Sequence, residues 1–259
     1  MKGHRILALL LRYWYITTNS MPRIFDIFYW PLMGVIVFGF TTLYLEKASG
    51  FSEIFVFLLG GLILWTFMER VQKDVAVYVL EDFWSRNVSN TFSTPIRKSE
   101  MFMSLTIFSL VRGIISFIIM FFAAILFYKF NVLNGNISVA LFTIPLLITA
   151  WSLGILVAGL IFRFGMRIAI FAWSTSYLLQ PFAGVYYPIT TLPLVMQKIA
   201  LFTPLMYVFE GFRNSYAGAF DAHNFWMGNL VAIIFLALGY LVFFFSLDTA
   251  KKKGLLAKY

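Results

Sequence analysis

Four charged side chains, Glu69, Arg70, Lys73 and Asp74, stand close together in a stretch that is otherwise largely apolar. Glu69 lies four residues before Lys73, and Arg70 four residues before Asp74, so each pair can neutralise itself on a helix. A charge at the centre of a bilayer costs roughly 2.5–3.5 kcal/mol, and such residues usually face a bundle interior or a polar cavity. The cluster therefore belongs either to a translocation path or to a helix whose cytoplasmic half projects into water.

A second set of polar side chains occupies residues 78–101, YVLEDFWSRNVSNTFSTPIRKSEM, the longest polar interruption in the chain. Its charged residues have both signs and are Glu81, Asp82, Arg86, Arg97, Lys98 and Glu100. Long apolar runs lie on either side of it. Between two membrane spans, a stretch of this kind forms a structured cytoplasmic loop, and we interpret it as the surface on which another protein pushes.

Motifs for enzymatic chemistry are absent from the sequence. It contains no P-loop pattern GxxxxGK[ST], no HExxH, no GxSxG and no cysteine. Its only histidines are His4 and His223, and His223 close to Asp221 is typical of a solvated loop pair rather than a catalytic dyad. We expect no catalytic residue, metal or cofactor on this chain, and we do not expect it to be an enzyme.

The composition identifies the environment of these side chains. Of the 259 residues, 61% are hydrophobic, 20% are aromatic and only 12% are charged, whereas soluble domains have an apolar share nearer one half. We therefore predict an all-α integral membrane protein with a single transmembrane domain over residues 1–259. The net charge of +9 fits the excess of Lys and Arg in cytoplasmic loops and does not indicate binding of nucleic acid.

The apolar runs predict six membrane-spanning helices. A span needs about 20 residues, and the expected spans are approximately 24–45, 54–80, 105–127, 137–162, 168–185 and 227–247. Basic residues collect before the first span, after the second, after the fourth and after the sixth. Because Lys and Arg favour the cytoplasmic side, both termini are expected in the cytoplasm.

Residues 1–22 have the pattern of an amphipathic helix that lies in the membrane interface. Arg5 and Arg12 fall on one face of such a helix, and Leu7 and Trp14 fall on the opposite face. The basic face is expected to point toward the lipid headgroups.

Residues 190–216 are too interrupted by prolines to form a clean span and too apolar to form a loop in water. Irregular backbone at membrane depth is tolerated where it packs against protein. We expect two short helices that dip into the outer leaflet.

Several stretches resemble a known family. VLEDFWSRN and STPIRKSE, which follow the second span, resemble the cytoplasmic loop of ABC-2 type permeases, the membrane subunits of type V ABC exporters. LLQPFAGVYYPITTLPLVMQKIALFTPLMYVFEGFR, residues 178–213, resembles the family's C-terminal signature. The positions on that signature are Pro181, Gly184, Tyr186, Tyr187, Pro188, Leu192, Pro193, Pro204, Glu210 and Arg213. The resemblance covers nearly the whole chain.

The resemblance implies a homodimeric pore in a bacterial inner membrane, surrounded by lipid, with two copies of a separate ATPase that hold ATP and Mg. The loop 81–104 would contain a coupling helix in the ATPase cleft, and residues 190–216 would be outer re-entrant helices. The implied ATPase-coupling residues are Trp84, Arg86, Asn87, Asn90, Pro95, Ile96, Arg97 and Glu100. The implied outer gate consists of Tyr186, Tyr187, Pro188, Pro193, Pro204, Glu210 and Arg213.

The function that the resemblance implies is export of a hydrophobic or amphipathic, drug-like or lipid-like compound, driven by ATP. Export of a lipid-linked polysaccharide by the same mechanism is one alternative. An ion-coupled transporter that uses the Glu69–Asp74 cluster is another, and a scaffold or channel without pumping is a third.

Overall fold

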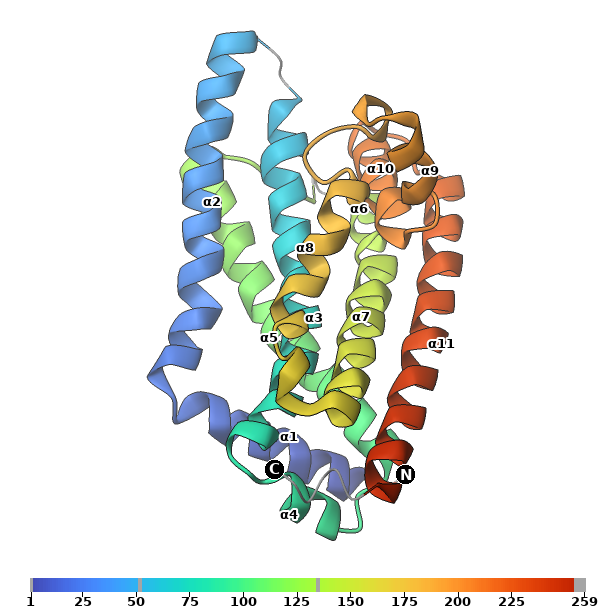
Figure 1. Cartoon of the computed structure of the whole chain (residues 1–259). Coiled ribbons are helices and arrows are strands. Elements are labelled where there is room, and N and C mark those ends of the chain that lie inside the picture. The colour runs from blue at the N-terminus through green and yellow to red at the C-terminus, as the bar shows by residue number, and fades with distance from the viewer. Residues whose placement is uncertain (1, 51–52, 134–135, 254–259) are drawn as a thin grey trace.

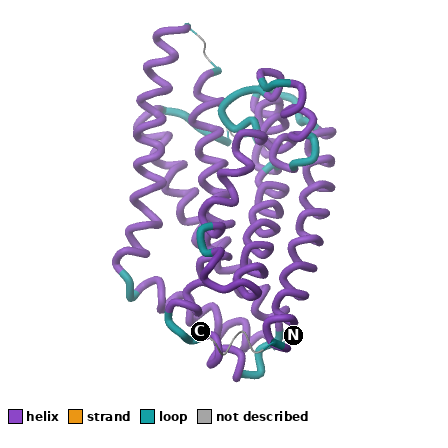
Figure 2. Tube along the Cα trace, viewed as in Figure 1, coloured by secondary structure: helices purple, strands orange, loops and turns teal. Residues whose placement is uncertain are grey.

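The computed structural model describes residues 2–50, 53–133 and 136–253, and these residues form helices and connecting turns without any strand (Figures 1 and 2). Long helices run side by side as a bundle. They are α2 (Met21–Ser49), α3 (Gly61–Trp84), α5 (Lys98–Tyr128), α7 (Thr143–Phe164) and α11 (Ala222–Lys252). The shorter α8 (Phe171–Ala183) packs against α3 and α7.

Short helices cover the two ends of the bundle (Figure 1). At one end, α1 (Gly3–Thr18) lies across the bundle near α4 (Val88–Ser93), and the last turns of α11 reach the same end. At the opposite end lie α6 (Ile137–Leu141), α9 (Leu194–Ala200) and α10 (Pro204–Tyr216). Single turns of other helix types are Val56–Gly60, a π-helix that continues into α3, and the 3₁₀ turns Gly165–Ile168 and Ile189–Thr191.

Local signals explain several helix boundaries. Pro22 and Pro204 stand in the first turns of α2 and α10, where the missing N–H has no cost because that group has no helical partner. Gly184 follows α8 with a φ of +63°, a conformation that glycine adopts without the steric penalty of a side chain. The fifth predicted span is therefore shorter as a helix than the apolar run suggests.

Four stretches have the length and composition of membrane spans: Met21–Ala48, Lys98–Tyr128, Ile137–Ile168 and Ala222–Lys252. The chain is thus a multi-pass membrane protein. The helix formed by Val56–Gly60 and α3 is long enough to cross a bilayer but carries the charged cluster, and α8, with 13 residues, extends about 20 Å. The number of six spans stays a prediction.

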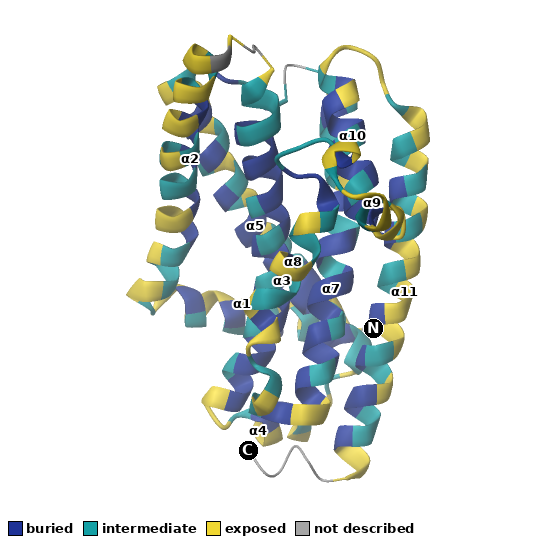
Figure 3. Cartoon of the chain, turned by 45° about the horizontal axis from the view of Figure 1, so that its top comes forward, coloured by how far each residue is buried: buried dark blue, intermediate teal, exposed yellow. Residues whose placement is uncertain are grey.

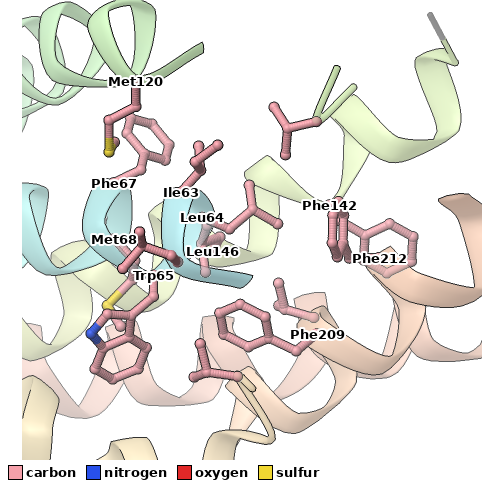
Figure 4. Close-up of a cluster of buried hydrophobic side chains, with 14 of the residues drawn as sticks. Ile63, Leu64, Trp65, Phe67, Met68, Met120, Phe142, Leu146, Phe209 and Phe212 are labelled. Carbon is pink, nitrogen blue, oxygen red and sulfur yellow. The ribbon is translucent and has the colours of Figure 1, made fainter. Parts of the chain in front are cut away.

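Helix α3 lies at the centre of the bundle, with side chains buried on most of its circumference (Figure 3). Its apolar residues form one core with residues of α5, α7, α10 and the turn before α7 (Figure 4). The labelled members are Ile63, Leu64, Trp65, Phe67, Met68, Met120, Phe142, Leu146, Phe209 and Phe212. A second apolar cluster, toward α1, includes Tyr13, Val79 and Phe108.

Small residues of α7 allow the backbones of α3, α7 and α11 to approach closely. A Cβ on Gly154 would lie 2.7 Å from the carbonyl oxygen of Gln72 in α3. A Cβ on Gly159 would lie 2.5 Å from the Cα of Phe243 in α11. Close packing of this kind stabilises helix pairs in lipid, where burial of apolar surface supplies little drive.

The amphipathic helix at the N-terminus is present as α1, but the expected direction of its basic face is wrong. Arg12 pairs with Asp82, and Arg5 lies 3.6 Å from Glu100, so both arginines point into the protein. The exposed stripe is instead apolar and contains Leu7, Leu11, Trp14 and Tyr15. The physical reason is that the carboxylates of Asp82 and Glu100 are buried, and a buried charge needs a partner.

Asp221 caps α11, which explains its proximity to His223 without catalysis. Its carboxylate accepts hydrogen bonds from the backbone N–H of Asn224 at 3.0 Å and from the side chain of Asn214 at 2.6 Å. Partial burial favours a higher pKa for Asp221, but these hydrogen bonds outweigh it and hold the pKa below its ordinary value.

We predict that Gly159→Ala destabilises the protein by about 1–3 kcal/mol, the usual cost of overpacking, although alanine is the better helix former. The matched control is Gly228→Ala in α11, where the nearest atom to an added Cβ is 3.4 Å away. The measurement is thermal unfolding of both purified variants in detergent. Equal stability of the two variants would contradict the close approach of α7 and α11.

Candidate functional site

The charged cluster is held by ion pairs between helices, not by the pairs within α3 that the spacing predicts. Arg70 donates hydrogen bonds to both the carboxylate and the backbone carbonyl of Asp26 in α2. Lys73 Nζ lies 3.6 Å from Asp26 Oδ1, and Arg112 Nη2 of α5 lies 3.6 Å from Asp26 Oδ2. Arg70 and Asp74 pair with residues of other helices rather than with each other, because both are almost fully buried at contacts with those helices.

Asp74 pairs with Arg112, whose Nη1 donates a hydrogen bond of 2.9 Å to Asp74 Oδ1. The same nitrogen donates to the Tyr78 hydroxyl at 3.1 Å. That hydroxyl lies 2.5 Å from the hydroxyl of Thr17 in α1. A continuous polar chain therefore connects α1 to α3 and α5 through buried side chains.

Asp26 and Arg112 were not included in the predicted site, although both belong to this network. The signal that identifies them is simple, because each is a charged residue inside an otherwise apolar predicted span. The aromatic Tyr177, by contrast, has no distinguishing signal in the sequence, and only the fold brings it to Glu69.

Beside the network lies a cavity of about 420 Å³ between α2, α3 and α8. Its walls include Asp26, Trp30, Glu69, Lys73, Trp173 and Tyr177. On α3, the side chains that are not buried between Thr66 and Val77 are Thr66, Glu69, Lys73 and Val77. These positions recur at helical spacing and form one open stripe on α3, of which Thr66, Glu69 and Lys73 line the cavity together with the buried Arg70.

The polar loop is clamped to the bundle rather than hanging from it. Arg12 pairs with Asp82 at the end of α3 and also donates to the Thr91 hydroxyl of α4 at 3.2 Å. Val88 and Thr91 lie on the buried face of α4, and Ser89, Asn90 and Ser93 are exposed on its opposite face. One face of α4 is thus fixed to α1 and α3, and the other is open.

The predicted coupling residues differ in their accessibility. Arg86, Asn90, Pro95 and Arg97 are exposed, whereas Asn87 and Ile96 are partly buried. Trp84 is 46% exposed and stacks on Trp173 of α8 at 6.1 Å between ring centroids.

Glu100 is buried, and its carboxylate forms hydrogen bonds within this chain. Its carboxylate accepts from the backbone N–H of Lys2 at 2.8 Å and from that of Arg97 at 2.9 Å. Glu100 therefore ties the start of α1 to the start of α5.

The predicted outer gate residues gather between α8 and α10. Arg213 lies 3.3 Å from Glu210, and it donates to the backbone carbonyl of Gly184 at 2.7 Å. Glu210 in turn accepts from the backbone N–H of Ile189 at 3.1 Å.

The tyrosines and prolines of this segment shape its turns. Tyr186 stacks on Phe38 of α2 at 5.4 Å, and the Tyr187 hydroxyl donates to the carbonyl of Pro181. Pro188, Pro193 and Pro204 immediately precede or begin the three short helical elements there.

These features define a class: a multi-pass helical membrane protein with buried ion pairs between its helices and a clamped polar loop at one end. Comparison with known families gives the assignment, because the family model described as ABC-2 type transporter matches residues 6–217. The chain belongs to the ABC-2 type transporter family. A search of the curated proteins finds no match.

Membership makes the chain a permease component of an ABC transporter and not its nucleotide-binding subunit. Permeases of this family generally work with separate ATPase subunits. The resemblance found in the sequence is thereby confirmed at the level of the family.

We predict that Arg112→Met costs about 3–5 kcal/mol, because it leaves the Asp74 carboxylate buried without its cation. The double variant Asp74→Asn/Arg112→Met removes both charges of that pair and should recover much of the loss. Unfolding midpoints of the purified proteins measure both effects, with the exposed Arg167→Met as control. A double variant no more stable than the single one would contradict the pairing.

We also predict that Tyr78→Phe loosens α1, since it removes the hydroxyl between Thr17 and Arg112. The expected cost is about 1 kcal/mol per hydrogen bond lost. Hydrogen exchange of the α1 backbone amides should become faster, while Tyr240→Phe, on the outward side of α11, should leave it unchanged. Unchanged exchange in Tyr78→Phe would show that α1 is held without this link.

Proposed function

We propose that this chain is the permease subunit of an ATP-driven exporter that moves a hydrophobic or amphipathic compound out of the cytoplasm or the inner leaflet. The observation that carries the proposal is the way in which α4 is attached to the bundle. Its open face is available to a partner, and its other face is joined to α1 and α3 by Arg12, Asp82 and Thr91. A force on α4 therefore acts on α3, the helix that forms one wall of the charged cavity.

The partner in this proposal is a pair of ABC ATPase subunits, which hold ATP and Mg. Arg86 and Arg97 flank the open face of α4 and are exposed, so they suit contacts with acidic groups on the ATPase. Glu100 and Ile96, which are buried or partly buried, shape the loop from within.

A homodimer completes the proposed pore. The cavity opens between α2 and α8, and both helices expose large apolar side chains such as Trp30, Phe40 and Leu178. A second copy, or lipid, covers such a surface in a membrane. The proposed location is a bacterial inner membrane, with α1 and α4 on the cytoplasmic side.

The network itself argues against ion coupling as the energy source. Asp26 and Asp74 both have basic partners within 4 Å on other helices, so their charges are engaged in holding α2, α3 and α5 together. Energy supplied by a partner at α4 is the better account.

We predict that the double charge reversal Arg86→Glu/Arg97→Glu abolishes stoichiometric co-purification with the ABC ATPase encoded nearest to this chain. Both side chains are exposed, so the free energy of unfolding should change by less than about 0.5 kcal/mol. The matched control is Lys47→Glu, an exposed charge at the other end of α2. The measurement is the ratio of the two subunits after purification in mild detergent.

Two outcomes would count against the proposal. Full recovery of the ATPase by the double variant would remove α4 and its flanks as the docking surface. Transport by the reconstituted unmodified protein that is indifferent to ATP and to the ATPase would remove the exporter function itself.

A further inference from the structure

The charges around the cavity divide into two sets. One set forms ion pairs between helices, and the other is less completely paired. Asp26 is shared by Arg70, Lys73 and Arg112, and Asp74 is paired with Arg112. Arg70 and Arg112 are buried, with 3% and 5% of their side chains exposed. Arg70 and Arg112 are therefore engaged with carboxylates of other helices, although Asp26, with 31% of its side chain exposed, and Arg70 also border the cavity.

Two charges on the open stripe of α3 remain. Within the described residues, Glu69 forms no salt bridge, and its side chain interacts with the Tyr177 hydroxyl of α8. Lys73 contacts Asp26 only at 3.6 Å, a distance too long for a hydrogen bond, and 17% of its side chain is exposed. Both side chains line the cavity.

The open pair has a fixed geometry. Residues four apart on a helix have Cβ atoms about 5–6 Å from each other on the same face. Glu69 and Lys73 thus present one negative and one positive group on adjacent turns. A ligand that complements both must itself carry a positive and a negative group a short distance apart.

Aromatic rings share the cavity with this pair. Trp173 and Tyr177 of α8 and Trp30 of α2 line the cavity, and they are 37%, 51% and 65% exposed. Ring faces attract ammonium groups, and their apolar area also accommodates a hydrocarbon chain. The cavity volume of about 420 Å³ falls within the range of small-molecule sites.

We propose that this cavity binds the headgroup of a zwitterionic amphiphile, with its ammonium at Glu69 and the aromatic rings and its phosphate or other acidic group at Lys73. The apolar tail leaves along Trp30 toward the membrane. This inference rests on the proposed export function and names the class of its cargo.

The test uses the full chain purified in dodecyl maltoside and native mass spectrometry to count bound amphiphiles. The probes share one tail: dodecylphosphocholine, dodecyl phosphate and dodecyltrimethylammonium. We expect dodecylphosphocholine to bind about tenfold or more tightly than either singly charged probe, the difference that one charge-assisted contact produces. Phosphocholine without a tail should bind more weakly than the amphiphile.

Substitutions in the open pair separate its two halves. Glu69→Gln should weaken dodecylphosphocholine and dodecyltrimethylammonium and leave dodecyl phosphate unchanged. Lys73→Met should weaken dodecylphosphocholine and dodecyl phosphate and leave the cation unchanged. The matched controls Glu53→Gln and Lys47→Met make the same changes at exposed positions outside this cavity and should alter no affinity.

The ranking of probes on the unmodified protein stands even if a variant fails to fold. Three outcomes would each overturn the proposal. The zwitterionic and singly charged probes could bind equally, or the control variants could lose as much affinity as the cavity variants. In the third, phosphocholine without a tail would bind as tightly as the amphiphile. None of these outcomes bears on co-purification with the ATPase, so failure here and failure of the exporter function are distinguishable.

Discussion

The arrangement of this bundle depends on the requirement that a charge inside an apolar environment must have a partner. Asp26 in α2, Asp74 in α3 and Arg112 in α5 cannot each be buried alone, and together with Arg70 they satisfy one another across three helices. Apolar contacts between helices in lipid have little directional preference, because the lipid tails are equally apolar. The ion pairs are directional, and they select which helices meet and at which turn. The glycines of α7 then allow α3 and α11 to pack closely on the other side.

The same requirement acts at the end of the bundle that carries α1 and α4, where it joins the amphipathic helix α1 to the rest of the protein. Arg5, Arg12 and Arg23 bind Glu100, Asp82 and Glu81, which belong to the loop and its flanking helices. The stripe of α1 that stays exposed is apolar. Because Thr17 of α1 also reaches Tyr78 and through it Arg112, α1, α4 and the buried network form one connected unit. A partner that moves α4 therefore has a physical route to the cavity.

The sequence predicts the class of fold well, because apolar runs, basic loops and proline positions depend on local rules that the bilayer enforces. It also locates the polar loop and the charged cluster. It fails for the partners of Glu69, Arg70, Lys73 and Asp74, since helical spacing suggests neighbours on α3 and the true partners come from α2, α5 and α8. Local spacing cannot supply contacts between residues separated by 38 or 44 positions. For the same reason, the sequence predicts that Arg5 and Arg12 face lipid headgroups, whereas their partners are the carboxylates of Glu100 and Asp82, far along the chain.

Stability and recognition place opposite demands on charged groups, and this chain meets them with different residues of one helix. A pair that holds helices together works best when it is buried, as Asp74 and Arg112 are. A group that recognises cargo must stay reachable and incompletely satisfied, as Glu69 and Lys73 are at the cavity wall. Both roles therefore fall on α3, with Glu69 and Lys73 on its less buried stripe and Asp74 on its buried face.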